Sequence, residues 1–204
     1  MTPKDNTRKL VLKQRDSIGI SAREQKSRQI CDQLIDMVNR FISNADNVTV
    51  PLHIAAYEPM HSEVDVHPFL HFAYTQNWVV NLPCMVKDSE GKAAHMVFFP
   101  ITAHQLEHER PAFLDHPARP YLLADLHAQG WHEIDPATFD VVIVPMVAFD
   151  STLMRLGYGG GNYDRFLPHL RKGCLVAGVA FEEQRIPNVP TEPHDLPLPR
   201  ILTA

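Results

Sequence analysis

An apolar run that opens into a glycine-dense loop constrains the fold of this chain more than any other feature. Residues 141–144 are all β-branched aliphatic, and four glycines follow within residues 157–161. A strand that is apolar at every position, rather than at alternate ones, is buried on both faces, as in parallel sheets covered by helices. The sequence therefore predicts a central strand at 139–144, with a ligand-binding loop beyond its carboxyl end.

Helical and strand-like segments alternate along the rest of the chain. Behind a capping-box pattern at Ser21, the apolar side chains Ile30, Leu34 and Val38 recur at helical spacing. A second helix is expected at 67–76. The expected strands are short apolar runs, two of them ended by Pro83 and Pro100, and lie at residues 52–57, 78–82, 96–99, 139–144 and 174–181. This order predicts an α/β fold, a three-layer sandwich with a mostly parallel sheet.

Length and composition limit the class of protein. A chain of 204 residues with 45% hydrophobic content predicts a single domain over residues 1–204. The net charge of -5 argues against nucleic-acid partners, and no apolar run approaches the roughly 20 residues that span a bilayer. Residues 1–15 lack a signal-peptide core, and three distant cysteines suggest reduced, buried thiols. We expect a cytoplasmic monomer with no membrane partner.

The glycine loop has the residue types of an anion site. Its backbone N–H groups are unshielded by side chains, Arg155 precedes them, and Asp164 follows them. The pattern is neither a Walker A loop nor a dinucleotide fingerprint, since no Gly-Lys-Ser/Thr follows and the glycines do not come directly after the strand. A helix starting near residues 163–167 would face its N-terminus toward the loop. These features favour an anion or nucleotide site over a plain turn.

Other polar groupings carry weaker signals. Lys4 and Arg8 lie on one face of a helix, with Arg15 roughly on the same face. The same spacing is also found in a basic stripe that is merely solvated. The acidic segment 58–65 follows a strand end, where ligand-contacting loops lie, although such loops are also commonly just solvated. His104 and His108 have helical spacing but no third ligand at a convincing interval, so no zinc site is expected. Residues 102–130 have no assignable pattern, and 187–199 should form an extended tail.

Several motifs together resemble the 5-formyltetrahydrofolate cyclo-ligase family over nearly the whole chain. The most specific is the run R-L-G-Y-G-G-G-N-Y-D-R at 155–165, which follows the strand end V-P-M-V-A-F-D at 144–150. The family often has a lysine between the last two glycines, and here Gly160 stands there. The remaining similarities are the Lys4-x-x-x-Arg8 opening, Y-E-P with E-V-D in 57–65, Leu82-Pro83, G-W-H-E at 130–133, where the family's proline is missing, and P-x-E-x-H-D at 190–195.

The resemblance implies a fold similar to that of sugar-phosphate isomerases and CoA transferases. It also implies ATP- and Mg²⁺-dependent conversion of 5-formyltetrahydrofolate to 5,10-methenyltetrahydrofolate. Arg155 and Asp164 would be catalytic, Asp164 and Asp195 would bind Mg²⁺, and Glu58, Glu63 and Tyr163 would contact the folate. The residues that would contact ATP are Lys4, Arg8, Arg155, Leu156, Gly157, Tyr158, Gly159, Gly160, Gly161, Asn162 and Tyr163.

Two other functions stay open at this point. One is a regulatory module that holds folate or nucleotide without turnover. The other is a sugar-phosphate isomerase-like enzyme, which would need a general base near a phosphate site but neither ATP nor a pair of carboxylates for a metal. The presence of both Asp164 and Asp195 speaks against the isomerase.

Overall fold

The computed structural model describes residues 2–44, 51–88, 94–192 and 195–204. Its main sheet has the strand order β3-β2-β1-β5-β8-β9, with β4 also paired to β2. All pairings are parallel except β2 with β3. The strands are β1 His53–Ala55, β2 Val79–Lys87, β3 His95–Pro100, β4 Tyr121–Leu122, β5 Val141–Pro145, β8 Leu175–Ala180 and β9 Ile201–Thr203, and a separate pair is β6 Ala148–Phe149 with β7 Arg155–Leu156. The expected mostly parallel α/β sheet is confirmed.

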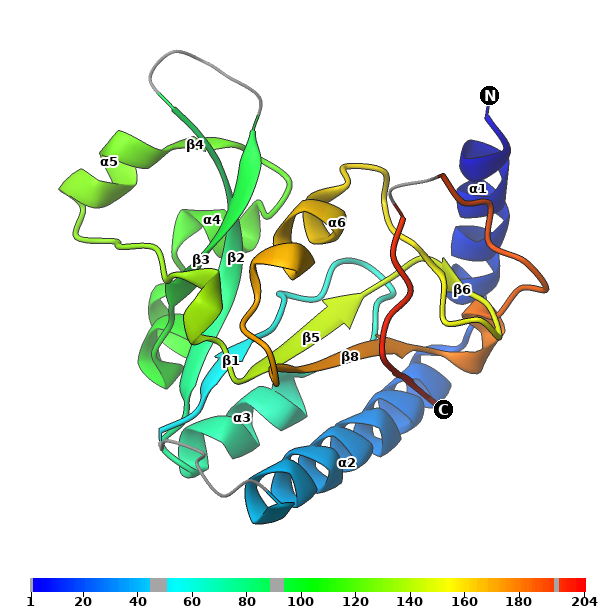
Figure 1. Cartoon of the computed structure of the whole chain (residues 1–204), viewed down its shortest axis with the longest axis horizontal. Coiled ribbons are helices and arrows are strands. Elements are labelled where there is room, and N and C mark those ends of the chain that lie inside the picture. The colour runs from blue at the N-terminus through cyan, green and yellow to red at the C-terminus, as the bar shows by residue number, and fades with distance from the viewer. Residues whose placement is uncertain (1, 45–50, 89–93, 193–194) are drawn as a thin grey trace.

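Helices cover both faces of this sheet (Figure 1). The long α2 (Ile20–Asn44) and α3 (His67–Thr75) lie on one face, and α6 (Asn162–Phe166) lies on the other. The other helical segments are α1 Pro3–Asp16, η1 Gln105–Glu109, α4 Ala112–Asp115, α5 Leu123–Ala128, η2 Pro136–Thr138, η3 Leu167–His169 and η4 Glu182–Gln184. None of the helices in these described ranges is long and apolar enough to cross a membrane.

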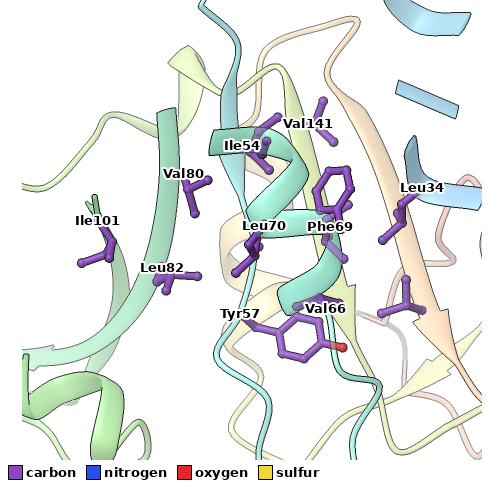
Figure 2. Packing of buried hydrophobic residues seen from close by; sticks show 14 of the residues in the cluster. Leu34, Ile54, Tyr57, Val66, Phe69, Leu70, Val80, Leu82, Ile101 and Val141 are labelled. Atoms are coloured by element: carbon purple, nitrogen blue, oxygen red, sulfur yellow. The ribbon is translucent and has the colours of Figure 1, made fainter. Parts of the chain in front are cut away.

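Strand β5 joins two hydrophobic cores, because its side chains alternate between the faces. Val141 and Ile143 pack with the α2 and α3 side chains, and Val142 and Val144 pack with Phe166 of α6. Figure 2 shows the first core, where Phe69 and Leu70 of α3 lie over the strands. Full burial of such side chains contributes about 1.5–3 kcal/mol each. This explains why the run is apolar at every position.

Of the two prolines expected to end strands, Pro100 does end β3, whereas Pro83 lies inside β2. Pro83 pairs with Phe98 in the middle of β2, and Pro100 closes β3 opposite Asn81. The Asn81 carbonyl accepts from Ala56, so the backbone of Asn81, and of Pro83 two residues on, faces the β1 side. Strand β1 has already ended at Ala55, so no strand there needs the missing N–H.

Three further expectations need adjustment. Helix α2 begins at Ile20, so Ser21 lies in its first turn and does not cap it. The unassigned 102–130 region contains η1, α4, β4 and α5. The tail at 187–199 leads into β9, an edge strand that the sequence did not predict because three residues are too few to show a period. The cysteines are free as expected, and burial raises the pKa of Cys31, Cys84 and Cys174 to about 12.

A capping box and a small third core hold α1 in place. Thr2 accepts from the Asp5 N–H, and the Asp5 carboxylate accepts in turn from the Thr2 N–H. Further along, Val11 is fully buried against Val147 and Leu156 of the β6–β7 region. Helix α1 is therefore seated on the segment that carries the glycine loop.

The close packing around β8 yields a stability prediction. A Cβ atom on Gly178 would overlap the Met146 methyl group and the Leu198 side chain. Gly178→Ala is expected to lower the free energy of unfolding by about 1–2 kcal/mol, because overpacking strains a filled core. Gly157→Ala is the matched control, since a Cβ there meets no atom within 4 Å. Urea unfolding compares them, and equal stability of the two variants would contradict this packing.

Candidate functional site

A cavity of about 520 Å³ lies beyond the carboxyl ends of β1 and β5. It brings together the residues predicted from the sequence to contact phosphate, folate or metal. These are Lys4, Arg8, Glu58, Glu63, Arg155, Leu156, Gly157, Tyr158, Gly159, Gly160, Gly161, Asn162, Tyr163, Asp164 and Asp195. His194 of the C-terminal motif lies outside the described residues. Segments from both ends of the chain thus meet at one cavity.

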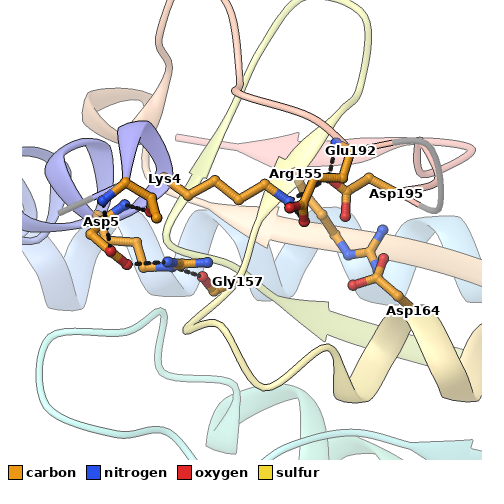
Figure 3. A network of polar contacts seen from close by, with 9 residues as sticks. Lys4, Asp5, Arg155, Gly157, Asp164, Glu192 and Asp195 are labelled. Atoms are coloured by element: carbon orange, nitrogen blue, oxygen red, sulfur yellow. Dashed lines mark hydrogen bonds and ion pairs between the residues drawn. The ribbon is translucent and has the colours of Figure 1, made fainter.

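Two cations in the cavity are paired with carboxylates (Figure 3). Lys4 Nζ lies 2.7 Å from Asp195 Oδ2 and 2.7 Å from Glu192 Oε2. Burial lowers the pKa of Lys4, but the hydrogen bonds and charges of these two acids outweigh it and raise the pKa. Arg155 donates from Nη2 to Asp164 Oδ1 and from Nη1 to the Leu196 carbonyl, both at 2.7 Å. Arg155 therefore joins the glycine loop to the C-terminal segment.

The glycine loop, residues 157–161, is held against α1 by Arg8. Arg8 donates from Nε to the Gly157 carbonyl at 2.8 Å, and its Nη1 pairs with Asp5 at 2.9 Å. Gly159 has a φ of 106°, and a Cβ there would lie 3.3 Å from the Arg8 guanidinium. Only glycine combines this left-handed backbone with so close an approach. The sequence RLGYGGGNYDR therefore needs glycine at this position to dock on the helix.

The loop at residues 58–65 presents two acids of different availability. Both Glu58 oxygens have partners, Arg110 Nη2 at 2.9 Å and His67 Nε2 at 3.2 Å. Glu63 Oε2 accepts from the Met60 N–H at 2.8 Å, whereas its buried Oε1 has no partner. Burial raises the pKa of Glu63, and the Met60 amide and the charge of Arg15 only partly oppose it. Glu63, rather than Glu58, is free to accept from a ligand.

The Tyr163 hydroxyl is a second buried group without a hydrogen-bond partner. Burial raises its pKa, so the hydroxyl stays protonated and can donate. Buried polar atoms are almost always paired in folded proteins. Two unpaired ones, Glu63 Oε1 and the Tyr163 hydroxyl, belong to residues that line this one cavity, where they are available to a ligand.

No preformed metal cage exists in the described parts of the chain. No group of three or more His, Cys, Asp or Glu side chains is arranged there to hold a metal ion. Asp164 and Asp195 supply two carboxylates, and Figure 3 shows the Arg155 side chain between them. This donor set suits a cation that takes most of its ligands from phosphate and water, as Mg²⁺ does.

Comparison with known proteins gives the family. The sequence profile described as the 5-formyltetrahydrofolate cyclo-ligase family matches residues 1–204. The chain belongs to the 5-formyltetrahydrofolate cyclo-ligase family. The enzyme of that name from Haemophilus influenzae is 45% identical over 64 residues, and the one from Escherichia coli is 43% identical over 65 residues. These matches cover 31% of this chain, and they span 34% and 36% of the length of the two relatives, respectively.

Two solved structures match over nearly the full length. A 5,10-methenyltetrahydrofolate synthetase from Mycoplasma pneumoniae superposes with a TM-score of 0.71 at 21% identity, covering 98% of each chain. One from Aquifex aeolicus gives 0.65 at 24% identity, covering 99% of this chain and 90% of the other. At these identities the likeness establishes that the cyclo-ligase fold is shared.

Some residues of the site gave no sequence signal of a role. Met85 and Met96 line the cavity as cross-strand partners on β2 and β3, and only sheet pairing brings them there. Arg110 comes from the region without a pattern, and His67 from the first residue of α3. In contrast, the G-W-H-E segment at 130–133 lies away from this cavity, where Trp131 packs on Phe113.

His67 pairs with Glu58 and Asp65 at the two ends of the 58–65 loop, and this contact yields a pH prediction. Hydrogen bonds to Asp65 and then Glu58 raise the pKa of His67 to about 9, against a usual value of about 6.5. Its contribution to stability is therefore complete below about pH 6.5 and is lost as the pH rises through about 9. His67→Asn should lower the unfolding free energy by about 1–2 kcal/mol at pH 6.5, given partial solvent screening.

Urea unfolding of wild type and His67→Asn at pH 6.5 and pH 10 measures this difference. At pH 10 the two proteins should differ much less, because His67 is then neutral in both the folded and unfolded states. Other titrating groups are common to both proteins and cancel. A stability difference that does not change with pH would contradict the ion-pair role of His67.

Proposed function

We propose that this protein converts 5-formyltetrahydrofolate to 5,10-methenyltetrahydrofolate and consumes ATP in the process. The observation that supports it best is that a single cavity holds both a phosphate-type loop with cations and two buried, unpaired polar groups. The loop side contains Lys4 and Arg155, and the other side contains Glu63 and Tyr163. Membership of the cyclo-ligase family supports the same assignment.

The chemistry explains why two ligands must share one cavity. The formyl carbon on N5 is an amide carbon, a poor electrophile whose oxygen is a poor leaving group. Transfer of the γ-phosphoryl group of ATP to this oxygen releases ADP and activates the carbon. N10 of the same molecule then attacks that carbon and loses its proton to solvent, the five-membered ring closes, and the C–O bond breaks to release inorganic phosphate. Positioning and charge neutralisation supply most of the catalysis in phosphoryl transfer.

The charged side chains change partners in this proposal. Lys4 and Arg155 now neutralise Asp195 and Asp164. Phosphate oxygens can replace those acids as partners of the two cations, and the glycine-loop amides add further donors. The two carboxylates released in this way are hard oxygen donors that would hold Mg²⁺. When bound, Mg²⁺ would neutralise negative charge on the phosphates.

The folate-facing groups suit the edge of a pterin ring. Glu63 Oε1 and the Tyr163 hydroxyl have no partner in the protein. Glu63 would accept from ring N–H donors, and the Tyr163 hydroxyl would donate or accept. A ligand with N–H donors would satisfy a buried carboxylate whose desolvation is otherwise costly. Glu58 would act indirectly, by holding Arg110 and His67 at the base of the loop.

The decisive experiment follows formation of the ultraviolet-absorbing methenyl product by purified protein. Product should form only when ATP and Mg²⁺ are both present, with one ADP released per product. Folate binding without product would favour a regulatory module instead. Conversion at the same rate without ATP would eliminate the ligase mechanism.

Asp164→Asn tests the exchange of ion-pair partners. Asn keeps the shape of the side chain but removes the charge that would hold Mg²⁺, so turnover should fall roughly a hundredfold, the loss of about 2–3 kcal/mol of charge-assisted contact. The Mg²⁺ concentration needed for half-maximal rate should rise. Folate affinity without nucleotide should change less than about twofold, because Asp164 is not assigned to the folate.

Titration of the rate against Mg²⁺ checks this, with Asp125→Asn as the control. Asp125 is an exposed acid in the first turn of α5, outside the cavity. The control should follow the wild-type curve. If the Asp164→Asn curve also superimposes on wild type, the metal role is wrong and Asp164 serves only as the partner of Arg155.

A further inference from the structure

Arg15 contacts both ligand loops. It lies in the last turn of α1 and is only 1% exposed. Its Nε donates to Ser62 Oγ at 2.9 Å, in the 58–65 loop that the proposed function assigns to the folate (the folate loop). Its Nη2 donates to the Tyr158 hydroxyl of the glycine loop at 2.8 Å, and the Tyr158 ring lies 5.9 Å from the guanidinium carbon. One buried cation thus joins two segments that are far apart in sequence.

The partners of Arg15 are unusual for a buried cation. Both of its hydrogen-bonded partners are neutral hydroxyls, and the third nitrogen, Nη1, is buried without any. Ser62 passes the contact on by donating to Asp16. The positive charge of Arg15 also acts on the buried Glu63 carboxyl, whose pKa it lowers against the effect of burial. A cation retained only to pair with carboxylates would be expected to hydrogen-bond them directly and to leave no donor unused. Its position between the two loops therefore calls for another explanation.

The guanidinium geometry suits a coupling role. Its N–H donors lie in one rigid plane, so the directions toward Ser62 and Tyr158 are fixed relative to each other. A ligand that restricts the conformational freedom of one loop would, through the shared guanidinium, also restrict that of the other. A second ligand then loses less conformational entropy on binding, which is positive cooperativity without a change of shape.

We propose that Arg15 is a positioning residue that makes nucleotide binding and folate binding interdependent, acting through Tyr158 and Ser62. The proposal rests on the proposed function, because it takes the glycine loop as the nucleotide side and residues 58–65 as the folate side. The Tyr158 hydroxyl is then a coupling element. This role uses the side chain of Tyr158, whereas phosphate binding by the glycine loop uses backbone amides, so a side-chain substitution tests the coupling alone.

Tyr158→Phe tests the proposal with a minimal change. The residue is 43% exposed, and the substitution removes only the hydroxyl that accepts from Arg15. Urea unfolding of the variant checks that it is folded before the ligands are titrated. The dissociation constant of 5-formyltetrahydrofolate is measured by calorimetry with and without saturating β,γ-methylene-ATP and Mg²⁺. In wild type, the nucleotide analogue should tighten folate binding about fivefold or more. In Tyr158→Phe, the ratio of the folate dissociation constants without and with the analogue should fall below about two.

Two more variants sharpen the result. Ser62→Ala should lose the same coupling, and the Tyr158→Phe/Ser62→Ala double variant should be no worse than either single variant, because both cut one connection. Tyr74→Phe is the matched control. Its hydroxyl donates to the Ile101 carbonyl, outside the cavity lining, so its ratio should equal that of wild type.

Amide hydrogen exchange of the ligand-free protein tests the coupling by Arg15 separately from the proposed function. Tyr158→Phe should speed exchange at Met60 and Glu63 in the folate loop, whereas Tyr74→Phe should not. Faster exchange in a protein that binds neither ligand would refute the proposed function and leave the mechanical link standing. The coupling would be overturned if the nucleotide analogue left the folate dissociation constant of wild type unchanged. It would also be overturned if the analogue changed that constant by the same factor in wild type and in Tyr158→Phe.

Discussion

The seating of α1 on the β6–β7 segment is the contact on which the whole cavity depends. Val11 is fully buried there against Val147 and Leu156. From this anchor the helix extends about two turns in one direction to Lys4 and about one turn in the other to Arg15, given 3.6 residues per turn. The apolar contact is small, yet it fixes where the cations of α1 lie relative to the glycine loop.

The cavity balances its own charges before any ligand arrives. Lys4 lies against Asp195, and Arg155 lies against Asp164. Such pairs stabilise the folded chain little when partly exposed, since desolvation and solvent screening offset the attraction. Their value lies in avoiding unpaired buried charges while leaving each cation able to take a phosphate as its partner. The two unpaired atoms of the cavity lining belong to Glu63 and Tyr163, and burial raises the pKa of both groups.

The sequence predicted local and periodic features well. The central strand at 139–144 and the apolar spacing from Ile30 to Val38 follow from burial on one or two faces, which leaves a visible period. The glycine loop was recognisable because few functions need so many unshielded amides. Features set by pairing between distant segments left no such trace. Examples are Pro83 within β2, the short β9, and Arg110 bound to Glu58.

The early end of β1 has a structural consequence beyond the fate of one proline. Val86 pairs with His95 on one side and with Tyr121 on the other, so β4 lies on the side of β2 where β1 has stopped. Between the last residue paired to β1 and the first paired to β4, β2 faces an opening in the sheet, and Pro83 and Met85 line the cavity there. Open strand edges tend to recruit foreign strands. Pro83 has no N–H group, so this internal edge offers one hydrogen-bond donor fewer to a foreign strand. The cavity also adjoins the edge at Pro83 and Met85.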